Sequence, residues 1–146
     1  MNQTNQTFLY EKVMVIDDSQ IDRYVASYNL KKFFFAKEVI AMASAKEALQ
    51  YLSELAFTPM ELPQYIFLDI RMPEIDGFEF LEKYSELPEV IQRQCIIMML
   101  SSSLNPDDHK RAEQNKFVKR FLNKPLNQEK LELLIQEHND LYKKVS

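Results

Sequence analysis

The sequence of 146 residues is poor in several features that mark whole classes of protein. Its single cysteine, Cys95, excludes a disulfide framework and a zinc site built from several cysteines. Its longest apolar run, residues 95–100, is far shorter than the roughly 20 residues that span a bilayer. Its charge is nearly balanced, with 18 Lys and Arg against 22 Asp and Glu. We therefore expect neither membrane insertion nor the basic face on which nucleic-acid binding depends.

The beginning of the chain also lacks a targeting signal. Residues 1–7 carry no charged side chain and have neither the basic start nor the apolar stretch of a signal peptide. The length is typical of one domain, and 46% hydrophobic with 27% charged residues is ordinary for a globular protein. We expect a soluble cytoplasmic protein, with residues 1–10 as a flexible tail and residues 11–146 as a single domain.

Five short apolar runs alternate with amphipathic stretches along the chain. The runs are residues 13–16, 39–42, 65–68, 95–100 and 117–122. The first four are almost uninterrupted, as expected for strands covered on both faces of a parallel sheet. The fifth contains Lys119 and Arg120, which favours an edge strand with one face in water.

Helix signals follow these runs. A capping side chain stands three residues before an acid in three pairs, Ser19/Asp22, Ser44/Glu47 and Asp76/Glu79. The last segment has apolar residues at steps of three and four from Leu131 to Val145. Five strand–helix units in succession predict an α/β fold with a doubly wound, five-stranded parallel sheet and right-handed crossovers.

Reactive side chains gather at the expected carboxyl ends of the strands, where sites form in such folds. They are Asp17 and Asp18, Asp69, Ser101, and Lys124. Each has an ordinary explanation when taken alone: a helix cap, a solvated hydroxyl or a surface lysine. Four of the five strand ends nevertheless bring such groups to one edge, which favours a functional site.

Three carboxylates in one pocket repel one another. At about 4 Å and an effective dielectric constant of about 20, each pair costs roughly 4 kcal/mol. A divalent cation together with the lysine neutralises them, and a ligand set made only of oxygens favours Mg²⁺, which is often shared with a phosphate. The sequence therefore predicts a magnesium-assisted phosphoryl site.

Four motifs carry a family resemblance. They are VMVIDDS at residues 13–19, FLDIRMPEIDGFE at 67–79, MLSS at 99–102 and FLNKP at 121–125. Over about residues 11–143 the chain resembles a response-regulator receiver domain of the chemotaxis-regulator type, the phosphoacceptor module of two-component signalling. The resemblance implies the flavodoxin-like strand order 2-1-3-4-5.

The same resemblance implies a role for each site residue. Asp69 is the phosphoacceptor, and Asp17, Asp18, Asp69 and the backbone carbonyl of Arg71 bind Mg²⁺, with Mn²⁺ as a substitute. Lys124 and Ser101 contact the phosphoryl oxygens, although Ser102 is an alternative to Ser101. Phe121 is the aromatic switch residue, and the bond between Lys124 and Pro125 is cis.

The resulting hypothesis is an apparently stand-alone receiver of a two-component system or phosphorelay. It takes its phosphoryl group from a phosphohistidine of a histidine kinase or phosphotransfer protein. It catalyses only its own phosphorylation and dephosphorylation and is not otherwise an enzyme. Phosphorylation changes the binding of a downstream protein to a face formed by the fourth helix, fifth strand and fifth helix.

Two alternatives belong to other functional classes. A haloacid-dehalogenase-type phosphatase also uses a strand-end aspartate, a hydroxyl residue and a lysine. Its acid/base aspartate stands two residues after the nucleophile, and here that position is Arg71, which cannot take the role. The other alternative is an interaction domain that works without phosphorylation, but the reactive groups expected of a receiver are all present.

Overall fold

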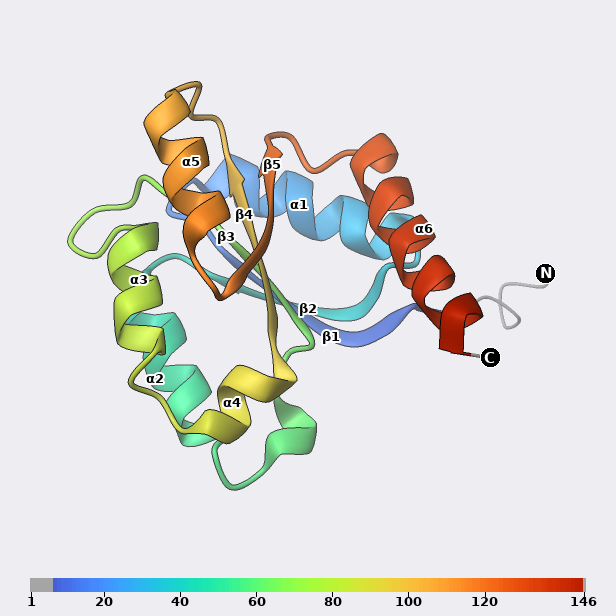
Figure 1. Ribbon diagram of the computed structural model, residues 1–146, viewed down its shortest axis with the longest axis horizontal. Helices are drawn as coiled ribbons and strands as arrows, with labels where there is room; N and C mark the ends of the chain where they lie inside the picture. Colours follow the sequence, from blue (N-terminus) through green and yellow to red (C-terminus); the bar gives the residue numbers. More distant parts are fainter. Residues whose placement is uncertain (1–6, 146) are drawn as a thin grey trace.

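The computed structural model describes the backbone of residues 7–145 and the side chains of residues 7–142. Its centre is a sheet of five parallel strands in the order β2-β1-β3-β4-β5, which confirms the predicted fold (Figure 1). The strands are β1 (Tyr10–Ile16), β2 (Ala36–Met42), β3 (Tyr65–Leu68), β4 (Ile96–Ser101) and β5 (Val118–Asn123). Each overlaps the apolar run from which it was predicted.

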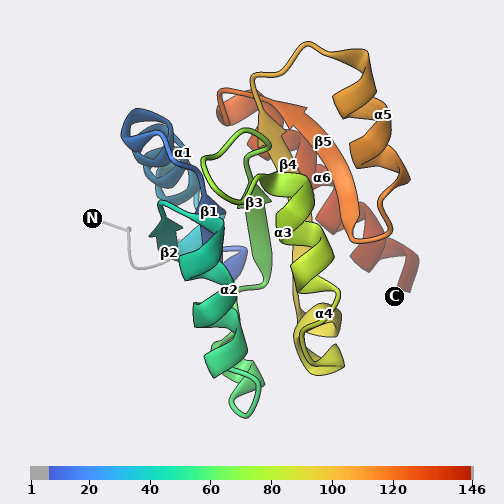
Figure 2. The ribbon, with the colours of Figure 1, turned by 90° about the vertical axis from the view of Figure 1, so that its left-hand side faces the viewer.

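Helices cover both faces of the sheet. They are α1 (Gln20–Lys32), α2 (Ala45–Glu54), α3 (Gly77–Tyr84), α4 (Glu89–Gln94), α5 (Pro106–Gln114) and α6 (Gln128–Val145), with the 3₁₀ turn η2 (Pro59–Glu61) before β3. Alternate residues of β1 face opposite ways, as the period of a strand requires. Val13 and Val15 join a core with α1 and α6, and Met14 and Ile16 join a core with α2 and α3. Figure 2 shows α2 and α3 side by side in front of the sheet.

The short helix α4 was not predicted. It has only six residues and no side-chain cap at Pro88, so it leaves little periodic signal in the sequence. Because α4 lies between α3 and β4, the predicted fourth and fifth helices are α5 and α6 of the structure.

The first strand begins at Tyr10. Tyr10 is the first residue of β1 and pairs with Ala36, and the Leu9 backbone N–H donates to the Phe34 carbonyl at 2.9 Å. The predicted tail, residues 1–10, therefore ends at the first residue of β1, and residues 1–6 lie outside the described part. Within residues 7–145, no helix combines the length and the apolar character needed to cross a membrane.

Candidate functional site

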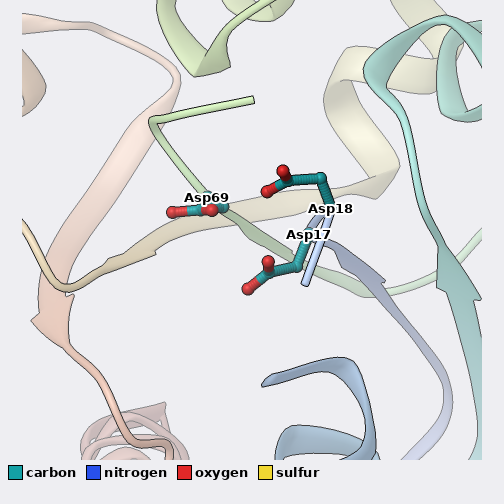
Figure 3. A group of neighbouring side chains, drawn as sticks. All are labelled: Asp17, Asp18 and Asp69. Atoms are coloured by element: carbon teal, nitrogen blue, oxygen red, sulfur yellow. The ribbon is translucent and has the colours of Figure 1, made fainter. Parts of the chain in front are cut away.

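Three carboxylates meet at the carboxyl end of the sheet. Asp17 and Asp18 directly follow β1, and Asp69 directly follows the neighbouring strand β3 (Figure 3). One oxygen from each lies within 4.8 Å of the other two. Asp17 is 2% exposed and Asp69 is 6% exposed, whereas Asp18 is open to solvent. The structure thus brings together the three acids that the sequence predicted to share a pocket.

Backbone hydrogen bonds fix the two buried acids. The Asp69 N–H donates to the Ile16 carbonyl at 3.0 Å, which ties the end of β3 to β1. One carboxylate oxygen of Asp69, Oδ1, accepts the Ile70 N–H at 2.8 Å, and Oδ1 of Asp17 accepts the Ser19 N–H at 2.9 Å. One oxygen of each carboxylate is thus held by the backbone, and the other, Oδ2, faces Lys124.

The only glycine of the chain, Gly77, lies against the loop that follows Asp69. The Gly77 N–H donates to the Ile70 carbonyl at 2.8 Å, which folds the loop after β3 back onto the start of α3. A Cβ atom on Gly77 would lie 2.5 Å from the backbone oxygen of Asp69. Only glycine allows this close approach, because the contact is to backbone and not to a flexible side chain.

Lys124 brings a positive charge to the acids from the end of β5. Its ammonium nitrogen Nζ lies 2.7 Å from Asp17 Oδ2, 3.3 Å from Asp69 Oδ2 and 2.8 Å from Asp22 Oδ2. Its backbone N–H donates to the Ser101 carbonyl at 3.0 Å, which anchors it to β4. The bond between Lys124 and Pro125 is cis, as the resemblance implied.

The charges of the pocket act strongly on one another. Burial raises the pKa of Asp69 to about 6, the neighbouring Asp17 adds to the rise, and Lys124 opposes it. Burial lowers the pKa of Lys124, but hydrogen bonds to Asp17 and Asp22 and attraction to Asp69 outweigh this and raise it. The lysine is therefore a fixed cation, and the excess negative charge of the pocket remains to be neutralised by a ligand.

A divalent metal ion would neutralise the excess negative charge of the pocket. The clustered ligands of Asp17, Asp18 and Asp69 are all carboxylate oxygens, which is the chemistry that Mg²⁺ and Mn²⁺ prefer. The exposed Asp18 leaves the cluster open to water on one side, which fits an ion that keeps several water ligands.

The serine run after β4 divides into buried and exposed residues. Ser101 is 1% exposed and ends β4, whereas Ser102 is exposed. The Ser101 hydroxyl oxygen accepts the Ser103 N–H at 3.2 Å, and the Ser103 hydroxyl donates to Asp108 at 2.7 Å. Ser101 is therefore the buried hydroxyl at the carboxyl end of β4, the strand next to β3.

Asp108 is a buried acid that the sequence did not single out. It lies in the first turn of α5 and pairs at 2.5 Å with Arg71, from the loop that follows Asp69. The ion pair joins the loop after Asp69 to α5. Asp22 was likewise seen only as a helix-capping residue, although its carboxylate reaches Lys124.

Phe121 lies in β5 under a histidine from α5. The rings of His109 and Phe121 have centroids 4.0 Å apart, and His109 Nε2 is hydrogen-bonded to the Ser103 carbonyl at 2.9 Å. The His109 side chain therefore links Phe121, the predicted switch residue, to the segment that follows Ser101.

Comparisons with known proteins agree on one family. Residues 13–136 match the family model described as response regulator receiver domain. The chain is 26% identical over 125 residues to the probable methanogenesis regulatory protein FilR2 of Methanothrix harundinacea, a match that covers 86% of this chain and 79% of that protein.

Solved structures give the same result. A response regulator receiver protein from Dyadobacter fermentans superposes with a TM-score of 0.77 at 30% identity, covering 87% of this chain and 96% of the other. The receiver domain of the histidine kinase CKI1 from Arabidopsis thaliana, complexed with Mg²⁺, superposes with a TM-score of 0.74 at 32% identity, covering 89% and 93%. Of the whole CKI1 kinase, the aligned part is 11%.

Proposed function

We propose, from the premise that this chain belongs to the response regulator receiver domain family and is a phosphoacceptor in two-component signalling, that Asp69 is the residue that takes the phosphoryl group. The observation that carries the proposal is the contact of Lys124 with Asp69 inside a cluster of three carboxylates. Membership of this family leaves the phosphatase alternative without support.

The transfer is an in-line displacement at phosphorus. A carboxylate oxygen of Asp69 forms the new O–P bond while the N–P bond of a phosphohistidine breaks, and the leaving imidazole nitrogen keeps the electron pair. Such transfers depend mainly on positioning and charge neutralisation. Lys124 supplies one fixed positive charge from the side of β5, and Ser101 supplies a hydroxyl donor from the end of β4.

The metal site fits the same chemistry. Asp17, Asp18, Asp69 and the backbone carbonyl of Arg71 would hold Mg²⁺ or Mn²⁺, and the ion supplies positive charge to the phosphoryl oxygens. Asp17 and Asp18 follow β1, which lies next to β3 in the sheet, so these two acids and Asp69 would hold the ion together.

Output follows from the contacts of the serine run. A phosphoryl group on Asp69 draws the Ser101 hydroxyl toward it, and the Ser103 N–H that Ser101 accepts must then move or lose this bond. Because the Ser103 carbonyl also holds His109 over Phe121, the movement changes the packing of the switch residue. Phe121 can therefore pack in two ways, and the phosphoryl group changes their populations only through the contacts that differ between them.

The face that changes is formed by α5, β5 and α6. Arg120 of β5 is bound to Glu137 of α6, so it is engaged within the domain, whereas Lys119 is exposed. We infer that a downstream protein reads this face and that a histidine kinase or phosphotransfer protein in the cytoplasm supplies the phosphoryl group. In this role the domain catalyses only its own phosphorylation and dephosphorylation.

Intact-mass measurement after treatment with a small acyl phosphate and Mg²⁺ tests the proposal. We expect one added phosphoryl group on the wild type and none on Asp69→Asn. Asp107→Asn is the matched control, because it removes an exposed acid from the first turn of α5, and it keeps the added mass. Labelling of Asp69→Asn, or undiminished labelling in excess chelator, refutes the assignment.

A further inference from the structure

Asp22 is a fourth carboxylate at the lysine of the site. Lys124 Nζ lies 2.8 Å from Asp22, almost as close as to Asp17 at 2.7 Å and closer than to Asp69 at 3.3 Å. The lysine side chain is 12% exposed and that of Asp22 is 42% exposed. The ammonium group has three N–H donors, and three carboxylates surround it.

The local structure of α1 leaves the Asp22 carboxylate free for this contact. Asp22 is the third residue of α1, and its own N–H donates to the hydroxyl of the cap Ser19 at 3.2 Å. In a complete capping box, the acid would accept the Ser19 N–H in return. That N–H instead donates to Asp17 at 2.9 Å, so the carboxylate of Asp22 reaches across to Lys124.

The four acids differ in what a metal ion does to them. Asp17, Asp18 and Asp69 form the oxygen cluster, and Asp22 lies outside it. A cation bound to Asp17 and Asp69 weakens their attraction for the ammonium group, because it shares the same negative charge. Asp22 keeps its full charge for Lys124.

We propose that Asp22 is a positioning residue for phosphoryl transfer, which holds the Lys124 ammonium group beside Asp69 when a metal ion occupies the other carboxylates. The inference rests on the proposed function, since it assigns Lys124 to the phosphoryl oxygens. With one N–H bound to Asp22, the remaining donors of the ammonium group stay directed at the pocket. Without Asp22, the flexible four-carbon stem of the lysine leaves the ammonium group free to move into water.

A matched residue separates this role from an ordinary helix effect. Glu47 occupies the same position in α2, where its N–H donates to the cap Ser44 at 3.2 Å, and it is exposed. Both acids favour the positive end of a helix dipole. Of these two first-turn acids, only Asp22 contacts Lys124. Glu47→Ala therefore reproduces the loss of the helix interaction alone.

The first test observes the lysine directly, without any phosphoryl donor. In ¹⁵N-labelled protein with excess Mg²⁺, a held lysine ammonium group gives a slowly exchanging NMR correlation, assigned to Lys124 by its loss in Lys124→Arg. We expect this signal in the wild type and Glu47→Ala, a weaker one in Asp22→Asn, and none in Asp22→Ala. A signal that persists unchanged in Asp22→Ala, or that is missing from the wild type, overturns the proposal.

The second test measures the rate of labelling by a small acyl phosphate at saturating Mg²⁺. We expect Asp22→Ala to be labelled about fivefold more slowly, the upper end for a partly exposed ion pair. Asp22→Glu restores the rate, and Glu47→Ala leaves it unchanged. Rates that are equal to or above the wild type in both Asp22→Ala and Asp22→Asn overturn the proposal, since the carboxylate would then act only by repelling the anionic donor.

The two tests also separate this inference from the proposed function. If the wild type gains no phosphoryl group, the proposed function fails, and the ammonium signal still decides whether Asp22 holds Lys124. If the wild type is labelled and the signal is independent of Asp22, only the role of Asp22 fails.

Discussion

Replacing Asp69 by asparagine is expected to stabilise the metal-free protein at neutral pH. Burial and the Asp17 charge raise the pKa of Asp69 from 3.8 to about 6 in the folded state. Between these two pH values the folded protein binds more protons at this site than the unfolded chain does, so the free energy of unfolding falls as the pH rises. Once the pH is well above the folded-state pKa of about 6, the free energy of unfolding falls no further because of this group.

The size of the effect follows from the shift. A rise of about two pKa units corresponds to about 3 kcal/mol at pH 7.5, and the low exposure of Asp69 means that solvent screens little of it. For a chain of this length, 1 kcal/mol changes the melting temperature by about 2–4 °C. We therefore expect Asp69→Asn to melt about 6–12 °C higher than the wild type at pH 7.5 in chelator.

The assay is thermal unfolding followed by circular dichroism, with and without metal. At pH 4 the advantage of Asp69→Asn shrinks toward zero, because the wild-type carboxyl is then largely neutral. Excess Mg²⁺ raises the melting temperature of the wild type more than that of the variant, since the ion binds the carboxylate that the variant lacks. Asp107→Asn removes a charge from the surface and gives no increase. An Asp69→Asn protein that is no more stable at pH 7.5, or equally stabilised at both pH values, refutes the reasoning.

Three further outcomes are expected. Gly77→Ala lowers the free energy of unfolding in urea by roughly 1–3 kcal/mol, because its Cβ atom would lie 2.5 Å from the Asp69 backbone oxygen; an unchanged midpoint contradicts the close packing of this loop. Ser101→Ala still gains a phosphoryl group but shows smaller NMR shifts at Phe121 and in α5 on phosphorylation than the wild type; equal shifts mean that the switch works without Ser101. His109→Ala changes the Phe121 ring resonances already in the unphosphorylated protein, because the neighbouring ring is removed, while the exposed Lys110→Ala control does not; unchanged resonances contradict the role of His109.

The main site was predictable because sheet topology does not depend on fine detail. Asp17, Asp69 and Lys124 each stand at or just after the end of an apolar run, and the carboxyl ends of parallel strands must share one edge. Once the five runs are recognised as strands, these side chains meet whatever the loops do. The strand order and the assignment of individual roles came from the family resemblance.

The remaining contacts were decided by the tertiary structure. Asp22 and Lys124 are 102 positions apart, and the sequence alone favours the local capping bond of Asp22 over a distant lysine. The contacts of Asp108 with Arg71 and of His109 with Phe121 likewise depend on where the first turn of α5 lies over the sheet. Strand ends are placed by backbone hydrogen bonds that any sequence makes, whereas these partners are chosen by side-chain direction and helix position, which local sequence patterns do not determine.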